Sequence, residues 1–148
     1  MKKLLSILFC SLLIISCQSQ KIKSVTTDES KAKFFLGSWK FVQKNYQDRS
    51  ETKIYPLHEC MKEYELIFRK ENQQTLMTKT FATGKDCKIK SQSGDFSVTI
   101  NESSISYTEY DLKKIDHYKI YSNKKFSIIY NDIIEGKVTE IEDVYQRK

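Results

Sequence analysis

The sequence predicts an all-β protein, a single antiparallel up-and-down barrel of about eight strands preceded by one short helix. The first observation is alternation: Tyr64, Leu66 and Phe68 share one face of the segment KEYELIFR, as in a half-buried strand. The second is that similar segments recur along the chain with turn residues between them. The third is that apolar residues do not repeat every 3.6 positions, which leaves little room for helices.

The one expected helix lies at the start of the domain. The polar run Asp28 to Ser30 can cap a helix over residues 31–36, KAKFFL, because such side chains accept hydrogen bonds from the free N–H groups of a first helical turn. Phe34 and Phe35 would then pack across one end of the sheet.

Eight strands follow in chain order. Their predicted ranges are 39–46, 62–69, 74–82, 95–100, 104–110, 115–121, 125–130 and 138–146. Stretches that contain Gly, Asn or Asp separate several of them, at 84–86, 101–103, 122–124 and 131–136. These residues suit hairpins, which need unusual backbone dihedral angles, so adjacent strands should pair antiparallel. Closing such a meander into a barrel removes the exposed edges of an open sheet.

The first 17 residues have the pattern of a removable export signal. Two lysines precede an apolar run of about twelve residues, which is shorter than the roughly 20 that cross a bilayer. Its end, IISC, resembles the lipobox of bacterial lipoproteins, which implies cleavage before Cys17, a diacylglycerol on the Cys17 sulfur and an acyl chain such as palmitate on the new amino terminus. Two or three chains, at about 0.8 kcal/mol per buried methylene, hold a protein on a membrane. A plain secretory signal with an incidental cysteine is the alternative.

This pattern divides the chain into three parts. They are a signal peptide over residues 1–17, a polar flexible tether over 18–30 and the barrel domain over 31–148. Removing 17 of the 148 residues leaves 131, one domain's worth, and losing Lys2 and Lys3 lowers the formal charge from +6 to +4. Because Gln18 rather than Asp follows Cys17, the resemblance favours the outer membrane as the location in the cell envelope.

Two cysteines remain in the processed chain, because Cys10 leaves with the signal and Cys17 carries lipid. An oxidising compartment and an even remainder predict a disulfide between Cys60 and Cys87. It would close a loop of about 27 residues and contribute roughly 3–4 kcal/mol in the chain-entropy model.

No metal, cofactor or catalytic site is expected. The alternative to the disulfide is a metal site on His58 and Cys60, but a structural zinc site usually takes four such ligands and only His117 remains elsewhere. Neither histidine has the context of a serine nucleophile, and four glycines in the chain form no phosphate loop. The lysines are dispersed, so nucleic-acid binding is not expected either.

A family resemblance rests on the two ends of the domain. The segment FLGSWKF, residues 35–41, runs from a short helical turn into a Gly-x-Trp strand, and the chain ends in VYQRK. This arrangement resembles the lipocalin family, and in outline the small lipocalin-like lipoproteins of bacteria, over nearly the whole mature chain. The resemblance implies that Trp39 closes one end of the barrel and that Arg147 packs on its indole, a cation–π contact of about 0.5–2 kcal/mol. An unrelated β-domain with a core tryptophan is the alternative.

Two functions remain open at this point. The first is a membrane-tethered carrier of a small apolar or amphipathic molecule. The second is an interaction module with a filled barrel, such as a periplasmic inhibitor of a lysozyme-type enzyme or an envelope assembly factor. The inward positions that would line a ligand cavity are Phe41, Leu66, Phe68, Phe96, Val98 and Ile128.

Overall fold

The computed structural model describes residues 27–148. The predicted signal peptide, the lipidation site Cys17 and the tether up to residue 26 lie outside the described residues. Within residues 27–148, no helix is long and apolar enough to cross a membrane.

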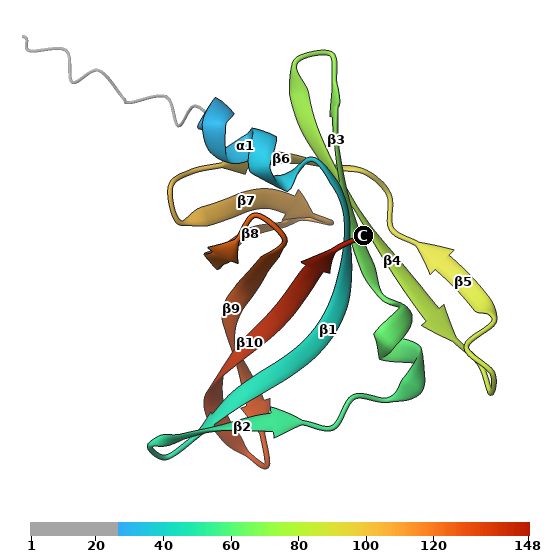
Figure 1. The fold of residues 1–148 in the computed structure, drawn as a ribbon, viewed down its shortest axis with the longest axis vertical. Helices are drawn as coiled ribbons and strands as arrows, with labels where there is room; N and C mark the ends of the chain where they lie inside the picture. Colours follow the sequence, from blue (N-terminus) through green and yellow to red (C-terminus); the bar gives the residue numbers. More distant parts are fainter. Residues whose placement is uncertain (1–26) are drawn as a thin grey trace, which may run out of the picture.

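β-strands make up 66% of the described chain (Figure 1). Its helices are the α-helix α1 (Glu29–Phe35) and the 3-10 helix η1 (Glu59–Glu63). The strands are β1 (Gly37–Asp48), β2 (Glu51–Tyr55), β3 (Glu65–Glu71), β4 (Gln74–Thr83), β5 (Ile89–Gln92), β6 (Phe96–Ile100), β7 (Ser104–Glu109), β8 (Leu112–Ser122), β9 (Lys125–Ile134) and β10 (Lys137–Arg147).

Eight of the strands close into an antiparallel barrel, which confirms the predicted fold. Around the barrel the order is β1, β3, β4, β6, β7, β8, β9 and β10, and β10 returns to β1. The closing ladder pairs Trp39 with Arg147 at one end and Tyr46 with Ile141 at the other. All eight predicted segments form these strands, with shifted bounds.

Two strands and one helix were missing from the prediction. β2 pairs with the second half of β1, β5 pairs with the second half of β4, and both are fully exposed. Neither strand has a buried face. The alternation of buried and exposed positions by which the other strands were predicted is therefore absent from both. The turn predicted over 131–136 was also too long, because β9 continues to Ile134 and the turn is formed by Glu135 and Gly136, both with positive φ.

Helix α1 is capped by Asp28, within the predicted capping run, but it begins at Glu29, two residues before the predicted start at Lys31. The Asp28 carboxylate accepts hydrogen bonds from the backbone N–H groups of Ser30 and Lys31, at 2.9 and 3.2 Å. The helix lies across one end of the barrel (Figure 1). Its Phe35 is fully buried there, and this end is called the closed end below.

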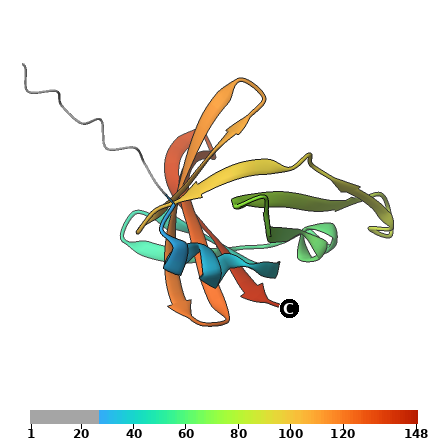
Figure 2. The ribbon, with the colours of Figure 1, turned by 90° about the horizontal axis from the view of Figure 1, so that it is seen from above.

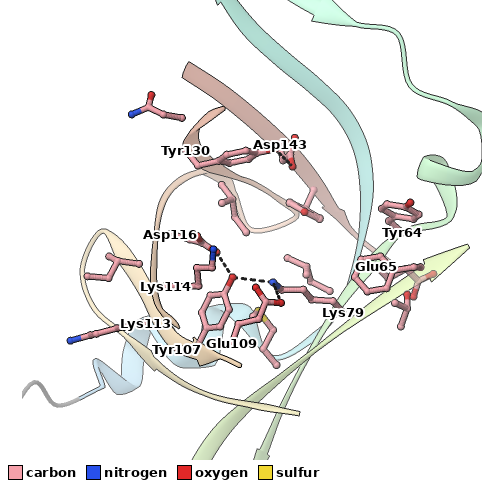
Figure 3. A pocket seen from close by; sticks show the side chains of 18 residues that line it. Tyr64, Glu65, Lys79, Tyr107, Glu109, Lys113, Lys114, Asp116, Tyr130 and Asp143 are labelled. Carbon is pink, nitrogen blue, oxygen red and sulfur yellow. Dashed lines mark hydrogen bonds and ion pairs between the residues drawn. The ribbon is translucent and has the colours of Figure 1, made fainter. Parts of the chain in front are cut away.

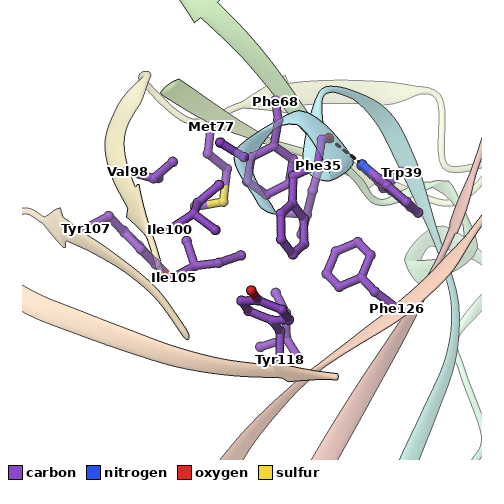
Figure 4. Packing of buried hydrophobic residues seen from close by; sticks show 13 residues of the cluster. Phe35, Trp39, Phe68, Met77, Val98, Ile100, Ile105, Tyr107, Tyr118 and Phe126 are labelled. Atoms are coloured by element: carbon purple, nitrogen blue, oxygen red, sulfur yellow. Dashed lines mark hydrogen bonds between the residues drawn. The ribbon is translucent and has the colours of Figure 1, made fainter. Parts of the chain in front are cut away.

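Aromatic rings fill the closed end (Figure 4). The Phe35 ring lies 4.9 Å from Tyr118 and 5.0 Å from Phe126, in edge-on contacts. The Trp39 indole lies 4.8 Å from Phe126, and its Nε1 donates a hydrogen bond of 2.6 Å to the Phe35 carbonyl. Each edge-on aromatic pair stabilises the folded state by about 0.5–1.5 kcal/mol beyond the burial of its apolar area. The closed end, where these rings gather, holds the hydrophobic core.

Arg147 of β10 contacts the end of α1 and the start of β1 at this point. Its guanidinium carbon lies 4.1 Å from the centre of the Trp39 ring. The guanidinium also donates hydrogen bonds to the carbonyls of Leu36, at 2.7 Å, and Phe34. Gly37 has a φ of +113°, and a Cβ there would lie 3.2 Å from Arg147 Nη1, so this arrangement requires glycine.

Candidate functional site

A cavity of about 440 Å³ occupies the barrel on the side away from α1. Strands β3, β4, β7, β8, β9 and β10 contribute its walls (Figure 3). Its apolar floor, shared with the core, is formed by Leu66, Met77, Ile128 and Tyr145. We call this part of the barrel the open end.

The first polar wall joins β4 to β7 and β8. Lys79 Nζ lies 3.0 Å from Glu109 Oε1 and donates a hydrogen bond of 3.0 Å to the Tyr107 hydroxyl. Tyr107 in turn donates to Asp116 Oδ2 at 2.9 Å. Burial, with Asp116 next to it, raises the pKa of Tyr107, so the hydroxyl stays protonated and acts as a donor.

The second polar wall is formed by Tyr130 of β9 and Asp143 of β10, which line the cavity, and Lys44 of β1 contacts both from outside the lining. Lys44 Nζ lies 3.0 Å from Asp143 Oδ1 and donates a hydrogen bond of 2.6 Å to the Tyr130 hydroxyl, which donates to Asp143 Oδ2 at 3.1 Å. Burial lowers the pKa of Lys44, but Tyr130 and Asp143 outweigh burial and the net pKa is raised. Burial raises the pKa of Asp143 against the opposing effect of Lys44. Both walls therefore hold a lysine, a tyrosine and carboxylates in one hydrogen-bonded group.

The first wall spans a place where the backbone ladder is short. β4 pairs with β6 through three residue pairs, Thr75–Val98 to Met77–Phe96, and β6 pairs with β7 through two. Beyond this seam β4 pairs with β5 instead, and the β4–β5 pair diverges from the β7–β8 hairpin, drawn in orange (Figure 2). The Lys79 side chain crosses this divergence to reach β7 (Figure 3). The Lys79 side chain thus links β4 to β7 where no backbone ladder joins the two strands.

Comparison with known families agrees with this architecture. The family model described as a lipocalin-like domain matches residues 35–141. The chain belongs to the lipocalin-like domain family. Members of this family are generally non-enzymatic binding proteins. No curated protein matches the chain.

The structure separates the six residues predicted to line a cavity in this lipocalin-like domain. Leu66 and Ile128 do line it. Phe68 and Val98 are buried in the core at the closed end and do not line this cavity. Alternation indicates which side of a strand faces inward, but it does not indicate the distance from α1 along the barrel axis.

The other two predicted lining residues also pack against neighbouring aromatic rings. Phe41 is buried with its ring 5.5 Å from that of Tyr145. Phe96 packs against the core with its ring 5.4 Å from that of Tyr107, under the Lys79 ammonium at 5.2 Å. Neither residue lines the cavity of the lipocalin-like domain.

Sequence reasoning missed the two polar walls. Lys79 follows Met77 by two positions and Glu109 follows Tyr107 by two, so both charges occupy inward positions of their strands. That alternation was a readable signal. Lys44 gave none, because an irregularity in the β1–β10 register between Phe41 and Gln43 shifts the inward positions by one residue.

The predicted disulfide between Cys60 and Cys87 is present and ties η1 to the loop after β4. Ligand atoms of His58, Cys60 and Cys87 lie within 4.8 Å of one another. Both sulfurs are used by the disulfide, however, and His58 Nδ1 accepts a hydrogen bond of 3.2 Å from the Cys60 N–H. The cluster therefore acts as a covalent link in this lipocalin-like domain.

Proposed function

We propose that this lipocalin-like domain is a membrane-anchored binding protein that holds a small apolar or amphipathic ligand in the open end of its barrel. The cavity is the observation that carries the proposal. Its volume of about 440 Å³ falls within the range of small-molecule sites, and an apolar floor with a few converging polar groups is typical of them. The filled closed end supplies the rigid frame.

The anchor in this proposal is lipid on Cys17, and the location is the outer membrane of a cell envelope. The lipobox-like end of the signal and Gln18 support both. The test is metabolic labelling with an alkyne-tagged palmitate analogue, followed by separation of inner and outer membranes. The intact chain should carry label in the outer-membrane fraction and Cys17→Ser should lose it. Label on the variant would contradict the anchor.

Ligand binding is tested separately on the mature protein purified from its own envelope. Native mass spectrometry with lipid extraction should find a stoichiometric small molecule that Leu66→Trp, which fills the floor, expels. Leu112→Trp, an identical change at an exposed position of β8 that does not line the cavity, is the matched control and should retain it. A clean mass that offered lipids leave unchanged would contradict the carrier.

A protein-interaction module, such as a lysozyme-type inhibitor or an envelope assembly factor, is the second candidate. One observation favours it: two hairpin tips expose large apolar side chains. These are Tyr110 and Leu112 between β7 and β8, and Ile133 and Val138 between β9 and β10. Exposed apolar groups at loop tips are common in binding surfaces. Inhibition of lysozyme by the mature protein, lost in Leu112→Ser, would support this function.

A further inference from the structure

The lysines of both cavity walls are already neutralised within the protein. Lys79 pairs with Glu109, and their side chains are 21% and 26% exposed. Lys44 pairs with Asp143, and their side chains are 14% and 16% exposed. In such partly desolvated surroundings a charge interacts with its neighbours more strongly than at the surface. The ion pairs therefore decide which ligand charges the cavity accepts.

The tyrosine hydroxyls next to these ion pairs are also hydrogen-bonded within the protein. Tyr107 accepts from Lys79 and donates to Asp116, and Tyr130 accepts from Lys44 and donates to Asp143. Each phenolic oxygen keeps one further lone pair. The walls can thus accept and donate hydrogen bonds at their edges, and in each of these two groups the ammonium lies 3.0 Å from a carboxylate oxygen.

The Lys79 ammonium is also held in place by aromatic rings. It lies 4.8 Å from the centre of the Tyr107 ring and 5.2 Å from that of Phe96. These cation–π contacts add to the ion pair with Glu109. Lys79 is therefore poorly placed to turn toward an anionic ligand.

A charged head group would meet a like charge on either wall. An anionic head next to Lys79 would lie beside the carboxylates of Glu109 and Asp116. A cationic head next to those carboxylates would lie beside the Lys79 ammonium. Lys113 also lines the cavity, but it is exposed, so solvent and salt screen it. Lys114 is half-buried and lies on the same face of β8 as the carboxylate-bearing Asp116, two residues further along the strand.

We propose that the cavity selects an uncharged amphiphile, whose apolar tail lies on the floor of Leu66, Met77 and Ile128 and whose head carries hydroxyl or amide groups. It discriminates against the free fatty-acid anion with the same tail. This inference rests on the proposed ligand-binding function and specifies the chemistry of the head group.

The test uses three ligands with one twelve-carbon chain and different heads, titrated calorimetrically into the mature protein at pH 7.5, below the micelle concentrations. They are 1-monododecanoylglycerol, dodecylamine and dodecanoate. The glyceride should bind at least about tenfold tighter than dodecanoate, with the amine between them. Equal or tighter binding of dodecanoate or the amine would overturn the inference while leaving ligand binding intact. Binding of none of the three would overturn the proposed function itself.

A variant isolates the residue that sets this preference. Glu109→Gln keeps the shape of the side chain and leaves the Lys79 ammonium without its carboxylate partner. Dodecanoate should then bind about tenfold tighter, while the glyceride changes less than about twofold. The matched control is Glu59→Gln, which removes a carboxylate 2.7 Å from Lys62 on η1, outside the cavity, and should change neither affinity.

The opposite substitution gives an independent result if Glu109→Gln does not fold. Lys79→Gln leaves Glu109 and Asp116 without the ammonium and should tighten dodecylamine binding by about tenfold instead. Unchanged dodecanoate binding in a folded Glu109→Gln, or unchanged amine binding in Lys79→Gln, would contradict the role of these pairs in selection.

Discussion

The closed and open ends of this barrel are built from the same strands but hold opposite kinds of side chains. β10 carries Tyr145 and Arg147 toward the aromatic core and Asp143 into the cavity wall. At the closed end α1 covers the barrel, and rings such as Phe35 and Phe126 are fully buried. At the open end charged pairs and tyrosine hydroxyls face the cavity. The part of each strand at the closed end thus contributes to the core, and the part at the open end contributes to the cavity.

The comparison predicts the largest loss of stability at the closed end. Phe35→Ala removes a fully buried ring and should lower the free energy of unfolding by about 3–5 kcal/mol. Phe81→Ala, at the cavity rim, should lower it by about 1 kcal/mol, because that ring is already partly exposed. Urea unfolding followed by circular dichroism measures both. Equal losses would show that the two ends are not energetically distinct.

Alkaline pH should affect the closed end through Tyr118, whose hydroxyl donates a hydrogen bond of 2.6 Å to the Asn101 carbonyl. Burial raises the pKa of Tyr118 from 10.0 to about 12. Its contribution to stability is therefore complete below pH 10 and is lost as pH rises through about 12. That loss is about 2–3 kcal/mol.

Unfolding free energies measured from pH 9 to 12 should consequently fall less steeply in Tyr118→Phe than in the wild type. Tyr110→Phe is the control, because that side chain is 94% exposed, and it should follow the wild-type curve. Parallel curves for all three proteins would rule out a role for Tyr118.

At the open end we expect smaller effects on stability. They are measured as the interaction free energy between the two members of an ion pair. In a double-mutant cycle, Lys44→Met and Asp143→Asn should each destabilise the protein, while the double variant loses less than the sum. The expected coupling is about 1–2 kcal/mol, because the pair is mostly buried and its removal leaves one charge alone. The same cycle on the exposed pair Glu59 and Lys62 should give no measurable coupling.

The smallest predicted loss of stability is at Arg147, where β10 contacts the end of α1 and the start of β1. Arg147→Lys keeps the charge near Trp39 but loses the forked hydrogen bonds to the carbonyls of Phe34 and Leu36. The free energy of unfolding should fall by about 1 kcal/mol, measured by urea titration. Arg49→Lys, in the exposed turn between β1 and β2, should be neutral.

The two ends also differ in how far the sequence predicts them. The capped helix and the alternating strands are predicted because each has one buried face, as in Leu66 and Phe68. β2 escapes prediction because all five of its residues are exposed. The inward position of Lys44 is not predicted because the irregularity after Phe41 shifts by one residue which side chains of β1 face inward. That irregularity arises in the pairing with β10 and leaves no signal in the local sequence. The family match covers the fold, and the charge pattern of the cavity comes from contacts between strands that are far apart in sequence.

The contact of Arg147 with the start of β1 has a consequence for how the chain acquires its fold. Arg147 and Leu36, which share a hydrogen bond, are 111 residues apart. Contacts of such separation form late, because the intervening chain must be ordered first. A polypeptide that emerges from a ribosome amino terminus first therefore cannot close this barrel until Arg147 has left the ribosome.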